Sequence, residues 1–540
     1  MKSQRLQTIG VLILIIILVT LGIFFRLNNL EKKIYWIDEV HTSLRISGYR
    51  KADFAELVPS NRVIGIKELH KFQQLSPEKT WSDTIFALAG NAEHAPLYYI
   101  LARLAMQWFD SSIEVTRGLA AVLSLLVFPG IYWLCLELFG LPLVGGIAMA
   151  LVAISPFHVL YAQEARQYSL WTATILFSSA ALQRAIRLQT TSAWFVYAVT
   201  VAVSLYSHLI SGLVCLGHGI YVLVYQLFCR DKDENYSVFS GYFLATVLGF
   251  ITLIPWMLLY IASGSSIGNW VAREIPFFTL FKRWLLNLSA IFFDMQVIYN
   301  ERLFDVEAGQ DGNIFATVNF LIYLIVPILI LVGYAVYFVC RQTTGRIWLS
   351  LITLIVVPAM AMVLPDIISG GQRSGIARYL IPSYLGIQIA VAYLLAVKIT
   401  GQRLVWRVVA IAIFTAGIIS CIVSGQAETW WNKYSCYYNI RVAKIINQTP
   451  RPLVISSSER VSRLVSLSYK LNPHTNLLLV ENGNLPKISE KFSDVFLFRP
   501  SGKLLEKIKR DDIYKIQPVY TIGSLWKLKI KNSPLVSPKS

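Results

Sequence analysis

Long apolar runs separated by short polar stretches fill the chain from its N-terminus to about residue 423. Most of these runs approach the roughly 20 residues that an α-helix needs to cross a bilayer. The pattern predicts eleven membrane-spanning helices, and the first, at residues 9–25, is an anchor with no small-residue cleavage site after it. The other ten spans are expected at residues 117–139, 142–160, 168–188, 193–210, 212–229, 239–262, 314–340, 347–364, 379–397 and 405–423.

One apolar run, residues 97–109, is too short to span a bilayer and better suits a helix lying at the membrane interface. This interpretation decides the orientation of every later helix. With the run kept out of the membrane, the basic clusters near Arg187, Arg341 and Lys398 share the side of the N-terminus, which the positive-inside rule makes cytosolic. The outer side then receives residues 28–95, 161–167, the turn near His208, 263–313, 365–378 and the chain beyond 424.

The chain after residue 423 loses the apolar pattern. Residues 454–456, 476–480 and 495–498 have the short apolar pattern of strands, and residues 458–469 have that of a helical piece. The predicted fold class is therefore an all-α polytopic membrane protein with a small C-terminal α/β domain. The expected division is a membrane domain over residues 1–423 and an extracytoplasmic α/β domain over 424–540.

Composition agrees with a membrane protein, because 55% of the 540 residues are hydrophobic and only 15% are charged. A soluble protein would carry roughly 25% charged residues. The net charge of +18 fits cytosolic retention of basic loops, and it also fits attraction to anionic lipid or a phosphate-bearing substrate. Nucleic acid is excluded as a partner, because the basic residues are scattered among apolar spans. The six cysteines form no CxxC pair, so they predict neither a zinc site nor a disulfide framework.

The first candidate for chemistry is the pair Asp38 and Glu39, which follows the anchor inside a long outer loop. Charge near the outer surface of a bilayer costs free energy unless it has a partner or a task. The alternative is a capping or solvated acidic pair at the membrane surface.

A second cluster lies in residues 155–168, between two apolar spans, and contains Glu164, Arg166 and Tyr168. The alternative here is an interfacial aromatic belt with a surface ion pair that is worth little energy.

A third cluster, at residues 370–379, combines glycines with Arg378 and Tyr379 at the mouth of a span. An arginine fork matches phosphate oxygens well. The alternative is a flexible basic loop that reaches the lipid headgroups. Asp366, just before this cluster, is interpreted as a turn residue, and His208 as a packing or interfacial residue.

The order of these motifs resembles the GT-C superfamily of glycosyltransferases, and more narrowly its family-39-like group, which is related to protein mannosyltransferases and includes aminoarabinose transferases. The resemblance covers roughly residues 1–420, and the match at 155–168 is the most specific. This chain departs from the family pattern at Ala95, where proline is usual, and at Ser207, where threonine is usual. The motifs that carry the resemblance are Asp38-Glu39, His94-Ala95-Pro96-Leu97-Tyr98, residues 155–168, Tyr206-Ser207-His208, Pro255-Trp256 and Arg378 to Pro382.

The resemblance implies a membrane glycosyltransferase that moves a sugar from a polyprenyl-phosphate donor on the non-cytosolic face, usually with inversion. Asp38 is then the candidate base that takes a proton from the acceptor hydroxyl. Glu39 would orient Asp38 or bind sugar, and the sequence does not separate these roles. The acceptor is a lipid, a glycan or a protein.

The resemblance also implies how the donor is bound. Arg166 and Arg378 would hold the phosphate and offset its developing charge, with help from His94. Glu164 would bind a sugar hydroxyl or position Arg166. The substrate-binding set implied in this way is His94, Glu164, Arg166, Tyr168, Arg378 and Tyr379. No cofactor is expected, and since the outer segments contain neither a carboxylate triad nor Asp-x-Asp, a divalent metal is not indicated.

The main alternative function is a transporter or flippase of lipid-linked sugars. Such a protein should carry charges in the middle of its spans and paired broken helices. Most spans here have apolar centres, with the polar groups gathered on one face of the membrane. A non-enzymatic scaffold would leave the clustered Asp, Glu and Arg without a purpose, so the pattern favours the glycosyltransferase.

Overall fold

The computed structural model describes residues 2–228, 238–262, 269–294, 324–401, 404–481, 488–489, 491–510 and 513–530. The chain forms two compact units, and each is described by itself. The helical unit comprises Met1–Leu30, Ala89–Ala102 and Glu114–Ala427. The sheet unit comprises Glu31–Leu88, Arg103–Ile113 and Glu428–Ser540. It therefore combines two segments from the first quarter of the chain with the C-terminal part.

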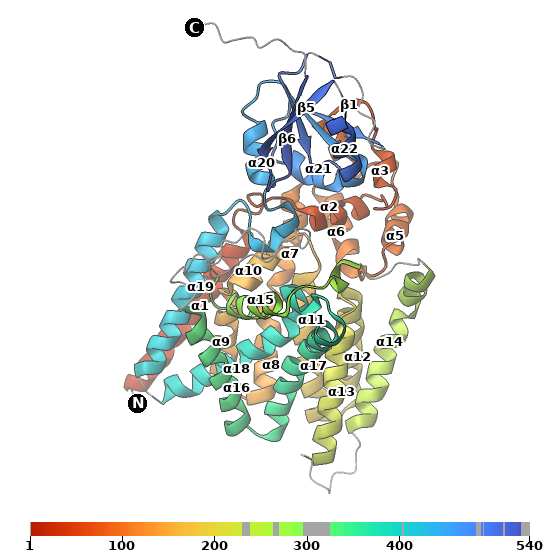
Figure 1. The fold of residues 1–540 in the computed structure, drawn as a ribbon. Helices are drawn as coiled ribbons and strands as arrows, with labels where there is room; N and C mark the ends of the chain where they lie inside the picture. Colours follow the sequence, from red (N-terminus) through yellow and green to blue (C-terminus); the bar gives the residue numbers. More distant parts are fainter. Residues whose placement is uncertain are drawn as a thin grey trace. The chain divides into compact units, whose positions relative to one another are not determined.

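The helical unit is a bundle of long apolar helices (Figure 1). Among the described residues, eight helices are long and apolar enough to cross a membrane, which confirms a polytopic membrane protein. Its helices are α1 (Lys2–Leu27), α7 (Ile113–Ser124), α8 (Val127–Phe139), α9 (Pro142–Ala153), α10 (Pro156–Ala162), α11 (Tyr168–Leu188), α12 (Thr191–Ser207), α13 (Ser211–Phe228), α14 (Val238–Ala262), α15 (Phe277–Ser289), α16 (Ile325–Gln342), α17 (Gly345–Ser369), α18 (Ile381–Thr400) and α19 (Leu404–Gln426).

Each predicted span is largely helical where the structure describes it, although the span 117–139 is broken at residues 125–126 and the span 142–160 at residues 154–155. The count of eleven stays a prediction. Helix α11 is not among the eight apolar candidates, α12 is shorter than they are, and α9 and α10 form a bent pair. Residues 314–323 of one predicted span lie outside the described residues. The run at 97–109 is helix α6 (Leu97–Trp108), and its predicted place at the membrane interface stays a prediction.

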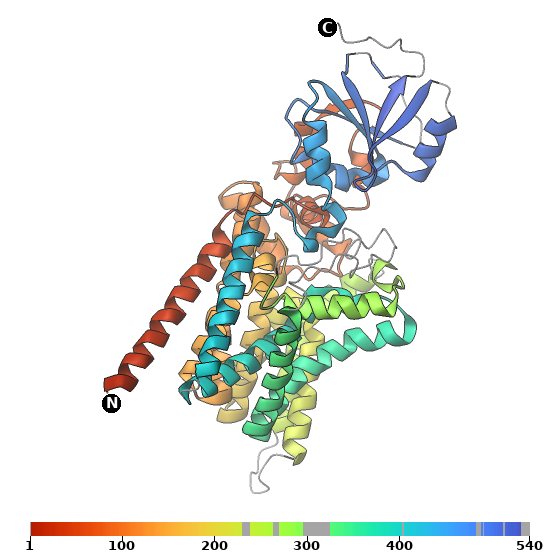
Figure 2. The ribbon, with the colours of Figure 1, turned by 60° about the vertical axis from the view of Figure 1, so that its left-hand side comes forward.

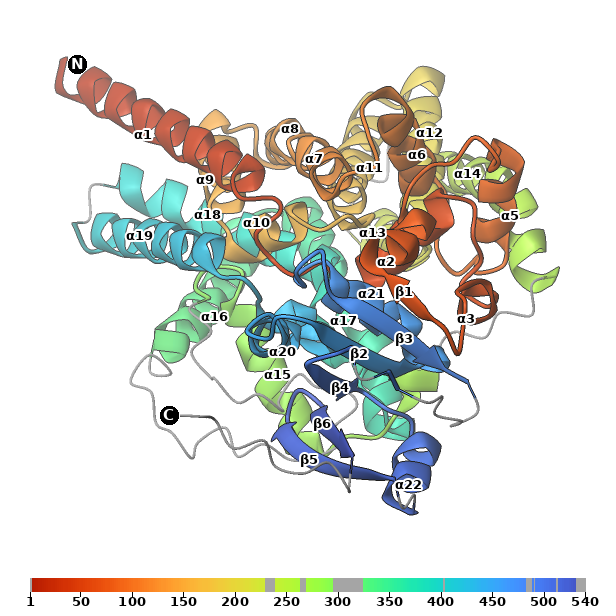
Figure 3. The same ribbon diagram turned by 90° about the horizontal axis from the view of Figure 1, so that it is seen from above.

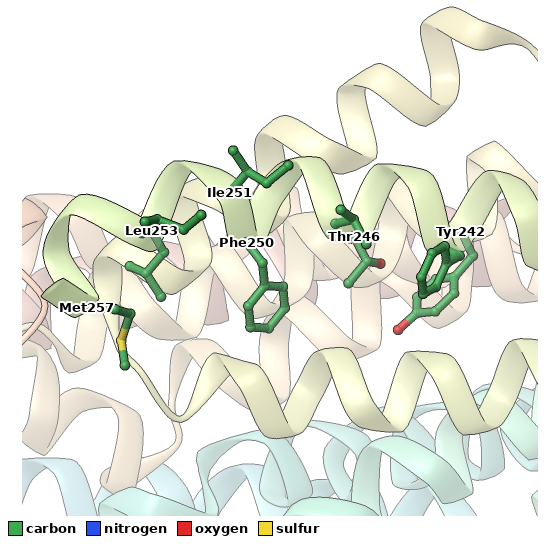
Figure 4. A pocket seen from close by; sticks show the side chains of 9 residues that line it. Tyr242, Thr246, Phe250, Ile251, Leu253 and Met257 are labelled. Atoms are coloured by element: carbon green, nitrogen blue, oxygen red, sulfur yellow. The ribbon is translucent and has the colours of Figure 1, made fainter. Parts of the chain in front are cut away.

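Helices α11 and α18 form the interior of the helical unit, since most of their side chains are buried. Helix α1 lies at the edge of the bundle, where it packs on α9 (Figure 2). Helix α14 exposes large apolar side chains such as Phe243 and Leu258, as a lipid-facing helix does. One face of α14, including Thr246, Phe250 and Met257, lines an apolar hollow of about 480 Å³ (Figure 4).

The chain bends by 62° between α9 and α10, at the start of the segment 155–168. The bend follows from local chemistry. The Ser155 side chain accepts a hydrogen bond from the N–H of His158, and Pro156 stands in the first turn of α10, which are both helix-start features. The imidazole of His158 lies 2.9 Å from the side-chain oxygen of Gln388, so this histidine hydrogen-bonds within the bundle.

The end of α9 is held by α1. Buried Arg26 donates hydrogen bonds to the carbonyl oxygens of Val152 and Ala153, in the last turn of α9. Gly22, one turn earlier on α1, makes this approach feasible, because a Cβ there would lie 2.5 Å from the Ala153 carbonyl oxygen. A glycine and a buried arginine on one helix therefore fix the position of the bend.

The sheet unit contains a six-stranded sheet in the order β1-β3-β2-β4-β6-β5 (Figure 3). Strands β3, β2 and β4 are parallel, and β1, β6 and β5 are added in antiparallel pairs. The strands are β1 (Val63–Gly65), β2 (Pro452–Ser457), β3 (Asn476–Val480), β4 (Asp494–Phe498), β5 (Tyr514–Tyr520) and β6 (Leu525–Ile530). Its helices are α2 (Ile37–Ile46), α3 (Phe54–Leu57), α4 (Ile66–His70), α5 (Trp81–Ala89), α20 (Asn439–Ile446), α21 (Val461–Ser468) and α22 (Gly502–Arg510).

The three strands and the helix that the sequence predicts after residue 423 lie at β2, β3, β4 and α21. The sheet also contains β1, which comes from the predicted first outer loop and pairs with β3. The compact unit is thus larger than residues 424–540, because residues 31–88 and 103–113 belong to it. The extracytoplasmic position of this unit stays a prediction.

Side chains of the first loop attach it to helix α21 within the sheet unit. The imidazole Nε2 of His41 lies 3.0 Å from the Ser462 hydroxyl, and that of His70 lies 2.8 Å from the Ser468 hydroxyl. The His70 ring also stacks on Tyr469 at 4.2 Å between centroids. Burial lowers the pKa of His70 to about 4, so this ring is neutral at neutral pH.

We expect Gly22→Ala to lower the melting temperature of the purified protein. The added methyl group on α1 would clash with the Ala153 carbonyl oxygen of α9, so the two helices would have to move apart. Overpacking of this kind costs about 1–3 kcal/mol. Gly10→Ala is the matched control on the same helix, because a Cβ at Gly10 meets nothing within 4 Å. Equal melting temperatures for the two variants would contradict this account of the α1–α9 contact.

The sheet unit should lose stability as the pH falls from about 6.5 towards 4. The pKa of His70 is lower in the folded chain than its usual value near 6.5, so over this range the unfolded state binds more protons. The loss is complete below about pH 4 and amounts to roughly 1–3 kcal/mol. Thermal unfolding from pH 7.5 to 4.5 should show a weaker pH dependence in His70→Gln than in the wild type. His474→Gln, at an exposed position, should keep the wild-type pH dependence.

Candidate active site

Asp38 and Glu39 lie in the first turn of α2, in the sheet unit, and their environments differ. Asp38 is half-buried, whereas Glu39 has no exposed surface. The α2 N-terminus favours negative charge, since its backbone N–H groups and its dipole both point towards it. The two neighbouring carboxylates are therefore not equivalent, although the sequence gives no way to rank them.

The Glu39 carboxylate is held by a buried lysine from residues 428–446, here called the C-terminal segment. Lys433 Nζ lies 3.1 Å from Glu39 Oε2, and both side chains are at most 1% exposed. The backbone N–H of Trp36 donates to the same oxygen over 3.4 Å, which completes a capping arrangement at the start of α2. Lys433 also lies 5.4 Å from the centre of the Trp36 ring.

The helical unit brings Arg166 and Arg378 together around one aromatic ring. The guanidinium carbons of Arg166 and Arg378 lie 5.8 Å and 5.6 Å from the centre of the Tyr168 ring. Both arginines are buried. Guanidinium groups match phosphate oxygens in charge and geometry, so a cluster that contains two of them is suited to an anion.

Tyr99 links this cluster to the segment that carries His94. Its buried hydroxyl accepts a hydrogen bond from Arg166 Nη1 over 3.0 Å and donates one to Gln167 Oε1 over 3.2 Å. The ring of half-buried His94 lies 6.2 Å from the Tyr99 ring, and its Nε2 lies 3.6 Å from the Glu93 carboxylate. His94 therefore borders the cluster through Tyr99.

Glu164 and Tyr379 flank the two arginines along the chain. Glu164 is fully buried in the turn between α10 and α11, and its carbonyl oxygen accepts a hydrogen bond from the Arg166 N–H over 2.7 Å. Tyr379 is half-buried, and the Arg378 guanidinium carbon lies 5.7 Å from the centre of its ring. The six residues expected to bind substrate thus all belong to the helical unit, whereas Asp38 and Glu39 belong to the sheet unit.

His208 joins the cluster, although the sequence interpretation made it a packing or interfacial residue. Its ring stacks on Trp171 at 4.3 Å and lies 6.1 Å from the Tyr168 ring. Burial, together with the charges of Arg166 and Arg378, lowers the pKa of His208 to about 3. The backbone N–H of Ile210 donates to His208 Nδ1 over 3.2 Å, so the neutral ring carries its proton on Nε2.

The loop before Arg378 is held by a network of hydrogen bonds. Asp366, whose side chain is buried, accepts bonds from the backbone N–H and the hydroxyl of Ser374, each over 2.7 Å, and pairs with Arg373 at 3.1 Å. Helix α15 adds a bond from Arg283 to the Gln372 side chain over 2.8 Å. Asp366 lies in the last turns of helix α17, so the prediction of a turn residue is wrong, and its side chain holds the loop that follows the helix.

Sequence reasoning missed three residues that the structure places beside the candidates. Tyr99 follows the His94 motif directly, and His208 ends the Tyr-Ser-His motif. These two motifs could therefore have pointed to both residues. Lys433 had no such signal, because it lies in the segment for which no resemblance was found. Among the described residues, no three His, Cys, Asp or Glu side chains lie close enough together to hold a metal ion.

No family model and no curated protein sequence matches this chain. Solved structures do match it. ArnT from Cupriavidus metallidurans bound to undecaprenyl phosphate aligns with a TM-score of 0.50 and 11% identity, over 97% of this chain and 98% of ArnT. The oligosaccharyltransferase AglB from Archaeoglobus fulgidus, in complex with an inhibitory peptide and a dolichol-phosphate, aligns with a TM-score of 0.48 and 11% identity, over 99% of this chain and 75% of AglB. At 11% identity, the likeness to ArnT shows that the two chains share a fold.

Proposed function

We propose that the chain is a membrane glycosyltransferase that moves a sugar from a polyprenyl-phosphate donor to an acceptor on the non-cytosolic face, with inversion. The observation that carries the proposal is the cluster of Arg166, Arg378 and His208 around Tyr168. Sequence segments far apart in the chain supply these residues, and all of them are buried or half-buried. ArnT, whose fold the chain shares, was solved with undecaprenyl phosphate, which supports a polyprenyl phosphate as the carrier.

The cluster has the chemistry that a departing phosphate needs. As the bond between the anomeric carbon and the phosphate oxygen breaks, negative charge grows on the phosphate. Guanidinium groups that are already fixed in place stabilise this charge without reorganising at the moment of reaction. The neutral ring of His208 adds a donor at Nε2 without adding a third positive charge to the cluster.

Asp38 is the proposed base. The acceptor oxygen attacks the anomeric carbon from the face opposite the phosphate, and its proton passes to the Asp38 carboxylate. Polyprenyl phosphate leaves, and the configuration at the anomeric carbon inverts. Asp38 is preferred over Glu39 because a base must come within hydrogen-bond reach of the acceptor, and Glu39 is enclosed with Lys433.

A donor-binding role for the arginines is tested with undecaprenyl phosphate as the probe. Arg166→Ala and Arg378→Ala should each weaken its binding by about 10- to 100-fold, because each removes a charge-assisted hydrogen-bond donor. Arg187→Ala is the matched control, since it removes the same charge from the other end of α11, where Arg187 pairs with Glu137 at 2.9 Å. If all three variants bind the probe equally well, the cluster is not a phosphate site.

The reaction itself is tested by incubating purified protein with a panel of labelled polyprenyl-phosphate sugars and a membrane extract as the source of acceptor. One labelled sugar should pass to a product, and Asp38→Asn should abolish that transfer while keeping undecaprenyl phosphate binding. The amide has nearly the shape of the carboxylate but cannot take the proton. Full transfer by Asp38→Asn would remove Asp38 from the mechanism. A flippase would instead move the lipid-linked sugar between leaflets of a vesicle and leave the sugar on its carrier.

A further inference from the structure

We propose that Lys433 is a positioning residue for the catalytic base, and that the C-terminal segment takes part in catalysis by holding the first turn of α2. This inference rests on the proposed function, because it takes Asp38 as the base. It assigns a task to a segment for which the sequence gave no functional signal. The carrying observation is the buried ion pair between Lys433 and Glu39, whose residues are separated by 394 positions in the chain.

The ion pair lies directly beside the proposed base in the chain. Glu39 follows Asp38 in the chain, and its Oε2 accepts hydrogen bonds both from Lys433 Nζ at 3.1 Å and from the backbone N–H of Trp36 at 3.4 Å. These contacts tie the lysine to Trp36, the residue directly before α2. Any shift of Lys433 therefore moves the backbone turn that carries Asp38.

Apolar contacts from the same C-terminal segment enclose the residues before Asp38. Ile34 and Trp36 pack with Cys436 and Ile440 in one buried cluster. The Trp36 ring meets Tyr434 edge to face at 5.5 Å between centroids. Apolar packing limits the movement of this segment but specifies no single position for its polar groups. The ion pair adds that specification, because a buried charge tolerates few arrangements of its partner.

A buried ion pair is weak evidence for stability, since hydrophobic residues of similar size often serve as well. Its presence at a fully buried position therefore points to a role in geometry. Half-buried Asp38 needs a fixed direction relative to the acceptor hydroxyl, and a misplacement of about 1 Å can cost about 100-fold in rate. Lys433 supplies that constraint without contacting the reacting atoms.

Four variants of the full-length protein separate positioning from folding. Lys433→Met and Glu39→Gln each break the pair, the double variant Glu39→Gln with Lys433→Met removes both charges, and Lys433→Arg keeps the positive charge. Lys444→Met is the matched control, because it removes a lysine of the same segment from an exposed ion pair with Glu428. Each variant is measured for melting temperature, undecaprenyl phosphate affinity, and kcat and KM with the donor found active in the labelled panel.

Lys433→Met should lower kcat by about 10- to 100-fold and leave undecaprenyl phosphate affinity within about twofold, because the donor cluster belongs to the helical unit. Lys433→Arg should retain more of kcat than Lys433→Met, and Lys444→Met should match the wild type. The double variant should recover part of the lost melting temperature, since no charge stays buried without its partner, while its kcat stays low. A double variant with wild-type kcat would reduce the pair to a fold-stabilising contact and overturn the proposal.

Hydrogen exchange gives a readout that does not depend on transfer. In Lys433→Met, amides of residues 37–42 should exchange faster, while those of residues 461–468 should keep the wild-type rate. Unchanged exchange at 37–42 would overturn the positioning role even if the protein is a glycosyltransferase. Failure of the proposed function has a different signature, because the wild-type protein would then bind no undecaprenyl phosphate and transfer no sugar. The exchange result would still decide whether Lys433 holds α2.

Discussion

A charge buried in an apolar interior must be met by hydrogen-bonding groups, because leaving it uncompensated costs several kcal/mol. Much of the arrangement described above follows from this constraint. Arg26 is met by the carbonyl oxygens at the end of α9, so α1 and the bend after α9 are fixed together. Arg103 of α6 is met in the sheet unit by the Ile46 carbonyl at 2.7 Å and the Thr84 hydroxyl at 2.6 Å. Glu39 is met by Lys433. In each case a charged side chain joins segments that lie far apart in the sequence.

The same constraint separates what the sequence could predict from what it could not. Apolar runs and short strands are local patterns, so the helices of the spans and strands β2, β3 and β4 could be placed from composition and periodicity alone. Strand β1 is only three residues long, and its place depends on pairing with β3 across most of the chain. No local pattern reports such a pairing. Lys433 is a similar case, because a single lysine shows its importance only when its buried partner is known.

The segment 155–168 shows why a motif match does not by itself name functional residues. Its first half builds the bend, through the Ser155 cap, Pro156 in the first turn and the hydrogen bond from His158 to Gln388. Its second half delivers Arg166 and Tyr168 to the cluster with Arg378. Both halves are needed, since the bend sets where α11 begins. The sequence match covers both halves alike and does not tell their roles apart. Only the contacts in the structure distinguish the residues that shape the backbone from those suited to a ligand.

The acidic pair 38–39 shows how a fold gives two neighbouring carboxylates different surroundings. Consecutive side chains on a helix point about 100° apart, so one can face the interior while the next stays accessible. Packing of residues 34–36 against Cys436 and Ile440 determines which one is enclosed. Glu39 faces Lys433 and is fully enclosed, whereas Asp38 stays half-buried. A segment from the far end of the chain therefore determines which of the two carboxylates is enclosed.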